Sequence, residues 1–299
     1  MQIIHKLLLK KPSFADKPLA EKLQQIDNRI ISAQPEEIPL LLNDISIDIF
    51  GELLLDVPAE YPNLRGFFPS MPPDEIQDQW TGNHGKALLA NSLAFIKTLV
   101  GGYTEITGKD MKQSSVLDYG CGWGRLLRLL YKYVPYENIY GVDPWDKSID
   151  LCKQYGIKAN LAICDYVPHN LPFERKFDLI FAFSVFTHLS EKTAKSVLST
   201  LRKYIQDSGL LVITIRPKKY WSFHKQGKFK DDMYRMHDER GFAFIPQQRA
   251  PIDGDITYGD TSMSLGYFEE NFPEWDVSRV ITNRVDSLQM VLFLRPAKT

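Results

Sequence analysis

Residues 115–143 read SVLDYGCGWGRLLRLLYKYVPYENIYGVD, and this stretch decides the fold. A short apolar run ends in Asp118, and glycines follow at positions 120, 122 and 124. Leucines then recur at helical spacing before a second apolar run ends in Asp143. A strand, a glycine turn, a helix and a second strand that ends in an acid are typical of one βαβ unit of a nucleotide-binding α/β sheet.

The glycine turn and its two acids favour S-adenosylmethionine over a dinucleotide. Asp143, at the end of the second strand, can accept hydrogen bonds from the ribose hydroxyls of either ligand. The spacing G-x-G-x-G, however, brings the third glycine one residue too early for the dinucleotide fingerprint. Asp118, just before the turn, would repel a pyrophosphate bound there. The same carboxylate would attract the ammonium and sulfonium groups of S-adenosylmethionine, so the turn is predicted to bind a cationic ligand.

The motifs DYGCGWG and GVD resemble motif I and the acidic loop of the class I S-adenosylmethionine-dependent methyltransferases, and the resemblance extends over residues 116–296. It implies a Rossmann-like α/β domain with a seven-stranded, mostly parallel sheet whose last strand is antiparallel. It also implies S-adenosyl-L-methionine as the cofactor, with Asp165 after the third strand bonded to the adenine amine. The predicted cofactor contacts are Trp80, Asp118, Gly120, Cys121, Gly122, Asp143, Pro144, Trp145, Asp165, Tyr166, Phe183 and Ser184.

Several residues near the predicted cofactor keep a structural alternative. Trp80 precedes a helix expected to close over the methionine end of the cofactor, but a core anchor explains it equally well. Trp145 can lie against the adenine or in the core. Cys121 is predicted to supply a small residue whose amide faces the ligand rather than a reactive thiol. Arg125 can bind the methionine carboxylate or an acidic acceptor, or it can form a surface ion pair.

The catalytic candidate is His188. The segment SVFTHL, residues 184–189, resembles the family's motif IV, which borders the methyl group to be transferred. If the acceptor is a hydroxyl, a general base would accelerate the reaction roughly 10²–10⁴-fold, and the pKa range of histidine suits this role. The alternative is a histidine that only hydrogen-bonds the loop below the cofactor. Further candidates, by position alone, are His224, His237, Tyr258 and Asp260.

Residues 216–262 form an insertion that we expect to be a cap over the acceptor pocket. A loop of this length inside a compact domain is usually functional or disordered, and a solvated loop with its own aromatic cluster is the alternative. Its aromatic and basic side chains would suit a sugar or a phosphorylated glycan. The segments HGKALLANSLAFIKTL, YGDTSMS and SLQMVLFLRP resemble bacterial methyltransferases that accompany polysaccharide assembly. The expected acceptor is therefore a small molecule or a sugar hydroxyl.

The chain is predicted to divide into a helical N-terminal extension, residues 1–80, and the methyltransferase domain, residues 81–299. Apolar residues at helical spacing predict helices over 17–33 and 84–100, whereas the prolines of 56–73 predict loop or extended chain. Further helices are expected over 36–55, 125–133, 146–155 and 263–272. Asp146 is expected to cap the helix over 146–155, and Ser190 to cap another helix that follows it. Further strands are expected over 159–164, 177–183, 209–215, 275–282 and 287–294.

Composition excludes several other classes of protein. The chain has 299 residues, with 36 basic and 37 acidic side chains and a net charge of −1, so it lacks the basic footprint of a nucleic-acid-binding protein. Its three cysteines show neither metal-ligand spacing nor a disulfide framework. No signal-peptide pattern and no bilayer-spanning apolar run is visible. We therefore expect a cytoplasmic protein without membrane insertion, and its oligomeric state stays open.

Two other functions remain open from the sequence. The first is a nicotinamide-dependent oxidoreductase, which Asp118 and the glycine spacing disfavour. The second is a catalytically inactive, cofactor-binding structural subunit. The presence of both acids and the glycine turn disfavours a decayed site.

Overall fold

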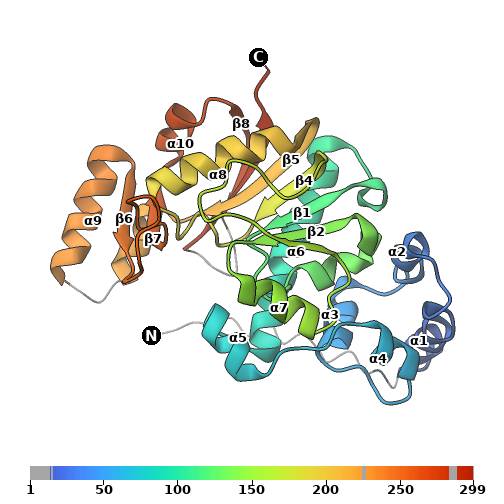
Figure 1. Ribbon diagram of the computed structural model, residues 1–299. Helices are drawn as coiled ribbons and strands as arrows, with labels where there is room; N and C mark the ends of the chain where they lie inside the picture. Colours follow the sequence, from blue (N-terminus) through green and yellow to red (C-terminus); the bar gives the residue numbers. More distant parts are fainter. Residues whose placement is uncertain (1–13, 15, 224–226, 283–287, 299) are drawn as a thin grey trace.

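The computed structural model describes residue 14 and residues 16–223, 227–282 and 288–298. Its centre is a seven-stranded sheet in the order β3-β2-β1-β4-β5-β9-β8 (Figure 1). The first five strands pair in parallel, and β9 is antiparallel to both of its neighbours. This confirms the predicted Rossmann-like fold with an antiparallel last strand. The strands are β1 (Val116–Tyr119), β2 (Ile139–Asp143), β3 (Asn160–Ile163), β4 (Phe177–Ala182), β5 (Ile205–Ile215), β8 (Trp275–Thr282) and β9 (Met290–Pro296).

The strand β4 shows why the apolar run forms the centre of the sheet. Successive side chains of a strand point to opposite faces. Leu179 and Phe181 belong to the hydrophobic cluster on one face, and Ile180 and Ala182 to the cluster on the other. All four are fully buried. A parallel strand covered on both sides requires such a continuous apolar run.

Helices cover both faces of the sheet. The helices α6 (Gly85–Thr107) and α7 (Asp146–Gln154) contribute side chains to the first cluster, and α8 (Glu191–Tyr204) and α10 (Leu265–Asn271) to the second. Ser190 caps α8 as predicted, with its hydroxyl accepting a hydrogen bond from the Thr193 amide. Asp146 does not cap α7, because the N-cap position belongs to Trp145 and Asp146 lies in the first turn.

The N-terminal extension is helical, as predicted, but it is more divided than expected. It consists of α1 (Lys17–Ile30), the 3₁₀ turn η1 (Pro35–Glu37), α2 (Ile38–Leu41), α3 (Ile47–Leu55), α4 (Pro62–Phe67) and α5 (Asp74–Thr81). A single helix over 36–55 was wrong, because residues 42–45 leave the helix and turn carbonyls toward Lys132. The helix α4 lies within the stretch expected to be loop, with Pro62 at a first-turn position where proline is tolerated.

Other element boundaries also differ from the sequence-based expectation. The leucine-rich segment after the glycine turn forms the 3₁₀ helix η3 (Leu127–Lys132). The helix α6 continues through Gly101 and Gly102. Glycine at position 102 allows close packing against the sheet, since an added Cβ there would lie 2.1 Å from the Phe293 ring. Met263 belongs to a strand, so α10 begins at Leu265. Two further 3₁₀ turns are η2 (Met111–Gln113) and η4 (Tyr136–Asn138).

The insertion folds into its own small unit rather than an irregular loop. It contains η5 (Lys218–Phe223), α9 (Gly227–Arg240) and a two-stranded antiparallel sheet of β6 (Phe242–Pro246) and β7 (Gly259–Met263). Figure 1 shows α9, β6 and β7 grouped together at the left of the molecule. A hydrophobic cluster around Trp221, Met233 and Ala243 holds this unit together. Its loop 247–258 returns to the central domain.

Some sequence-based expectations lie outside the described residues. They concern residues 1–13, His224 and Ser287. The division of the chain at residue 80 stays a prediction. Among the helices that the structure describes, none has the length and apolar character required to cross a membrane.

Candidate active site

A cavity of about 770 Å³ lies at the carboxyl ends of β1, β2, β4 and β5. Ligands of open α/β sheets bind at this edge. His188 and all predicted cofactor contacts except Asp165 line the cavity. Asp165 is an exposed residue, although its neighbour Tyr166 reaches the cavity wall. A bond from Asp165 to adenine therefore stays a prediction.

The glycine turn adopts a conformation that other residues resist. Gly120, Gly122 and Gly124 have φ values of 79°, 55° and 78°, in the region that favours glycine. The amides of Gly120 and Cys121 both donate to the Val142 carbonyl, at 2.8 and 3.0 Å. A Cβ at position 120 would lie 2.5 Å from the Val185 side chain. The turn is thus fastened to β2 and leaves room for a ligand beside its backbone.

Two backbone amides hold the Asp143 carboxylate in place. The Gly122 amide donates to Oδ2 and the Trp145 amide to Oδ1, each at 3.0 Å. Burial raises the pKa of Asp143, and these amide hydrogen bonds oppose the rise. Each carboxylate oxygen retains a further lone pair for a ligand donor. The acid that the sequence placed against a ribose is therefore oriented by the glycine turn itself.

The other end of the turn pairs an acid with an arginine. Asp118 is only 2% exposed, and burial raises its pKa well above the usual value, while the Arg125 charge lowers it. Arg125 is partly buried, donates to the Ser92 hydroxyl at 2.9 Å, and lies 5.2 Å from the Phe183 ring centroid. This position excludes a surface ion pair for Arg125. A carboxylate and a guanidinium at one end of a cavity complement the ammonium and carboxylate of an amino acid.

Two tryptophans form the wall beside Asp143. Trp80, from α5, stacks on Trp145 with ring centroids 4.7 Å apart and an interplanar angle of 19°. Trp145 is 42% exposed, so it is not a core residue. Trp80 lines the cavity, as expected of a ligand contact, and it also packs against the small cluster around Leu88 and Trp123, as expected of a core anchor. The extension thus contributes to the cavity.

His188 lines the cavity, and contacts with Gly259, Arg216 and Tyr258 hold its ring. Its Nδ1 lies 2.7 Å from the Gly259 carbonyl oxygen, which identifies Nδ1 as the protonated nitrogen. Its Nε2 lies 3.3 Å from the Arg216 guanidinium, and its ring stacks on Tyr258 at 4.8 Å. Burial, then the Arg216 charge, lower the pKa of His188 to about 4. The imidazole is therefore neutral at pH 7, with Nε2 as the acceptor.

The insertion supplies the remaining wall beside His188. Arg249, Thr257 and Tyr258 line the cavity, as does Arg216 at the start of the insertion. Asp260 contacts Arg216, which places it behind the wall. His237, in contrast, is buried beside Ser262 and does not line the cavity.

The sequence missed several cavity residues. Arg216 directly follows the fifth strand, and this position at the carboxyl edge of the sheet was a usable signal. Arg249 lies in a loop whose path nothing in the local sequence reveals. Thr81, Val185 and Leu189, which also line the cavity, belong to the predicted contact segments 80–82 and 184–189. Cavity residues that the sequence did not indicate as contacts are Gln79, Leu88, Asn91, Tyr119, Trp123, Leu126, Thr193, Arg216, Arg249, Thr257 and Gln289.

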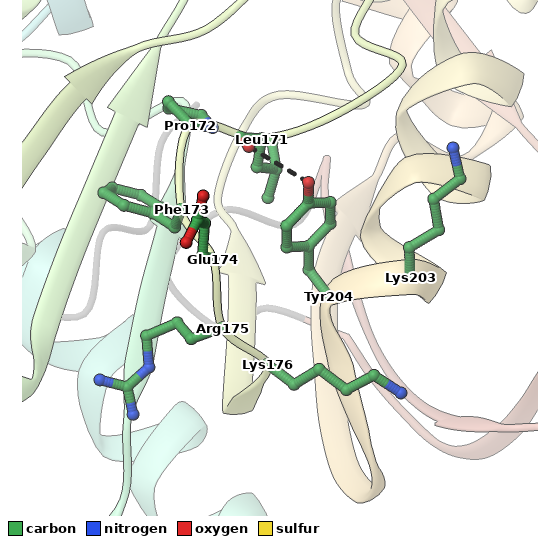
Figure 2. A pocket seen from close by; sticks show the side chains of 8 residues that line it. All are labelled: Leu171, Pro172, Phe173, Glu174, Arg175, Lys176, Lys203 and Tyr204. Atoms are coloured by element: carbon green, nitrogen blue, oxygen red, sulfur yellow. Dashed lines mark hydrogen bonds between the residues drawn. The ribbon is translucent and has the colours of Figure 1, made fainter.

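A second depression lies away from this site (Figure 2). It is formed by the loop 171–176 and by Lys203 and Tyr204 at the end of α8. The Tyr204 hydroxyl donates to the Leu171 carbonyl at 3.2 Å. Because this depression borders the start of β4, it lies at the sheet edge opposite the glycine turn.

Sequence comparisons place the central part of the chain among methyltransferases. Residues 116–209 match a family described as a methyltransferase domain. The chain is 30% identical over 105 residues to a demethylmenaquinone methyltransferase of Thermotoga maritima, covering 35% of this chain and 44% of that protein. It is 26% identical over 117 residues to O-methyltransferase 3 of Dictyostelium discoideum, covering 36% and 27%. The chain therefore spans less than half the length of these curated relatives.

Solved structures resemble the fold at low sequence identity. An S-adenosylmethionine-dependent methyltransferase from Clostridium acetobutylicum gives a TM-score of 0.49 at 14% identity, covering 75% of this chain and 97% of that one. Magnesium protoporphyrin IX methyltransferase from Synechocystis PCC 6803, with S-adenosylmethionine bound, gives 0.47 at 13% identity, covering 84% and 97%.

The sequence match and the geometry concern the same residues. The matched segment contains the glycine turn, Asp118, Asp143 and His188, and it includes the strands β1 to β4 and the start of β5. Residues 116–209 therefore match a methyltransferase domain, and this match includes the glycine turn and its two acids.

Proposed function

We propose that this protein transfers the methyl group of S-adenosylmethionine to a hydroxyl of a small molecule or a sugar. The observation that carries the proposal is the arrangement of two carboxylates around the glycine turn. Asp143 is oriented by the Gly122 and Trp145 amides, and Asp118 is buried at the other end beside Arg125. A ribose and a cationic amino acid fit these two positions together.

The cavity residues would divide the cofactor among them. Asp143 would accept hydrogen bonds from the ribose hydroxyls, and the adenine would lie against the stacked pair Trp80–Trp145 and Tyr166. The Asp118 carboxylate would attract the ammonium group, and its pKa would fall as a cation approaches. Arg125 would bind the methionine carboxylate. S-adenosylmethionine supplies an activated methyl group when bound.

Catalysis would depend mainly on alignment. The acceptor oxygen forms a bond to the methyl carbon while the carbon–sulfur bond breaks, and S-adenosylhomocysteine is the leaving group. The acceptor also loses its hydroxyl proton. Holding the acceptor oxygen in line with the methyl group would supply much of the rate enhancement.

His188 is our proposed acceptor of the hydroxyl proton. Its neutral Nε2 lies 3.3 Å from the Arg216 guanidinium, so the acceptor hydroxyl would have to displace this contact before Nε2 takes its proton. A general base works best when its pKa lies near the operating pH, so a pKa of about 4 makes His188 a weaker base than the sequence implied. Replacing it should therefore lower kcat by roughly 10- to 100-fold, at the lower end for general-base catalysis.

The two alternative functions are disfavoured by different observations. A pyrophosphate at the turn would lie close to the buried Asp118, which disfavours a nicotinamide-dependent oxidoreductase. An inactive cofactor-binding subunit is disfavoured by a cavity that extends beyond the cofactor contacts to His188 and Tyr258.

A thermal-shift experiment tests the proposal. The melting temperature is measured with S-adenosylhomocysteine, S-adenosylmethionine or NAD, for the wild type, Asp143→Ala and the control Asp150→Ala. Asp150 is an exposed acid on α7. A ligand at 100 times its Kd stabilises a protein by about 2.7 kcal/mol. We expect a rise with the two sulfur ligands for the wild type and control, and little or none for Asp143→Ala. A rise with NAD alone would overturn the proposal.

A further inference from the structure

We propose that the methyl acceptor carries an anionic group, a carboxylate or a phosphate, and that Arg249 binds it at the end of the cavity beside His188. The inference rests on the proposed function, because it concerns the same cavity. It follows from the different bonding of the two arginines that the insertion brings to this end.

The Arg216 guanidinium already contacts other residues of this chain. Its Nη1 donates to Asp260 Oδ1 at 2.7 Å and to the Thr187 carbonyl at 2.8 Å. Its Nη2 lies 3.3 Å from His188 Nε2, and its guanidinium lies 4.0 Å from the Tyr220 ring centroid. The Asp260 carboxylate neutralises its charge. Arg216 therefore positions His188 and contributes little attraction for an anion.

Arg249 is held differently. Its guanidinium lies over the Tyr258 ring at 4.2 Å, and Tyr258 in turn stacks on His188 with an interplanar angle of 4°. Among the carboxylates that the structure describes, none forms an ion pair with Arg249. A guanidinium fixed by stacking on one side can still present its fork of N–H donors to a carboxylate or phosphate.

The loop that carries Arg249 is anchored to the central domain. Tyr258 forms a β-bridge with Leu189, and the Ser190 amide donates to the Thr257 carbonyl at 3.1 Å. The Gly259 amide donates to the His188 carbonyl at 2.8 Å. These bonds fix Tyr258, and with it the surface on which the guanidinium lies. Arg249 itself is exposed, and its guanidinium is placed at the cavity wall by its contact with this anchored ring.

In the described part of the chain, Arg249 is the cation beside His188 that has no carboxylate within ion-pair distance. Arg216 and Asp260 balance each other, and the neutral His188 adds no charge. Arg249 remains, with hydroxyls of Thr193 and Thr257 also lining the cavity. An anionic group bound here would contact Arg249, whereas the ammonium group of S-adenosylmethionine would contact the Asp118 carboxylate. Such an acceptor would be oriented within the cavity by its charge.

The test uses the protein saturated with S-adenosylhomocysteine. Sodium phosphate or sodium acetate is titrated at constant ionic strength against sodium chloride, and the melting temperature is recorded. The variants are Arg249→Gln, Arg249→Lys and the control Arg29→Gln, an exposed arginine on α1. We expect a saturable rise for the wild type and control. The apparent Kd should rise at least fivefold in Arg249→Gln and by less in Arg249→Lys. The anion that binds more tightly identifies the group.

The outcomes separate the two proposals. Stabilisation by S-adenosylhomocysteine without any anion response in the wild type overturns the anionic acceptor and leaves the methyltransferase intact. An equal response in the wild type and Arg249→Gln has the same consequence. If S-adenosylhomocysteine itself fails to stabilise the wild type, the proposed function fails, and this inference fails with it. An unchanged response of Arg249→Gln to S-adenosylhomocysteine shows that the variant is folded.

Discussion

At the scale of single residues, His188 makes stability depend on pH. Its pKa is about 4 in the folded protein against about 6.5 in an unfolded chain. Between these values the unfolded state binds more protons, so the free energy of unfolding falls as the pH drops from 6.5 toward 4. The slope from one such group is at most about 1.4 kcal/mol per pH unit.

The variant His188→Gln, which has no group to protonate, should therefore lose less stability than the wild type over this range. Urea unfolding of both proteins between pH 7.5 and 4.5 measures the difference. His84 and His237 titrate in both proteins, so their contributions cancel in the comparison. Parallel curves for the two proteins would show that His188 is not held neutral by the fold.

Residues whose roles depend on local geometry were predictable, and those that depend on distant segments were not. The acids Asp118 and Asp143 flank a glycine turn whose spacing alone indicates a ligand site. The surroundings of His188 depend on β7, about 70 residues further along the chain. The strand β7 brings Gly259 to Nδ1, and the end of β5 brings Arg216 to Nε2, so the local sequence indicated a histidine of ordinary pKa.

At the scale of elements, α5 contributes Trp80 to the cavity wall, where we propose that the cofactor binds. The indole stacks on Trp145 and lies 3.8 Å from the Cβ position of Gly122. Aromatic stacking contributes about 0.5–1.5 kcal/mol beyond the area buried. Trp80→Ala should therefore raise the Kd for S-adenosylhomocysteine roughly two- to tenfold, as measured by calorimetry.

Two comparisons control for an indirect effect of this substitution. Trp80→Phe keeps an aromatic face and should bind more tightly than the alanine variant. The melting temperatures without ligand report any loss of packing around Leu88 and Trp123. Equal Kd values for the wild type and Trp80→Ala would assign Trp80 to packing alone.

The predicted elements were most accurate where burial decides the structure. The run over β4 is apolar because both faces are covered, and the strand formed as expected. Leucine spacing after the glycine turn did not distinguish an α-helix from the observed 3₁₀ helix, in which the Leu129 amide donates to the Leu126 carbonyl three residues back. Apolar residues three apart share a face in both helices. The break between α2 and α3 depends on a lysine about 90 residues away.

At the scale of the whole molecule, the extension and the sheet share one hydrophobic core. Leu23 and Phe50 of the extension belong to the same cluster as Phe181 and Phe293 of the sheet. Arg128 adds a polar connection, because its Nε donates to the Gly124 carbonyl and its Nη1 to the Ser70 carbonyl, at 3.3 and 3.0 Å. The extension thus contacts the segment that carries the glycine turn. These contacts predict a single cooperative unfolding transition.

Lys132 tests this coupling most directly. The ammonium is buried and donates to the carbonyls of Leu42 and Ile45, at 2.6 and 2.5 Å. Burial lowers the pKa of Lys132, and these carbonyls satisfy its donors. Replacing it with methionine keeps the length of the side chain but leaves buried carbonyls without a donor, at a cost of about 1–3 kcal/mol. Lys132→Met should therefore lower the free energy of unfolding by that amount.

Urea unfolding followed by fluorescence and by circular dichroism measures both the stability and the cooperativity. The control Lys153→Met replaces an exposed lysine on α7 and should change the free energy of unfolding by less than about 0.5 kcal/mol. If the extension and the domain unfold as one unit, both signals shift together in Lys132→Met. Two separate transitions in the wild type would contradict a shared core. A stability loss in Lys132→Met no larger than in the control would show that this lysine does not couple the two parts.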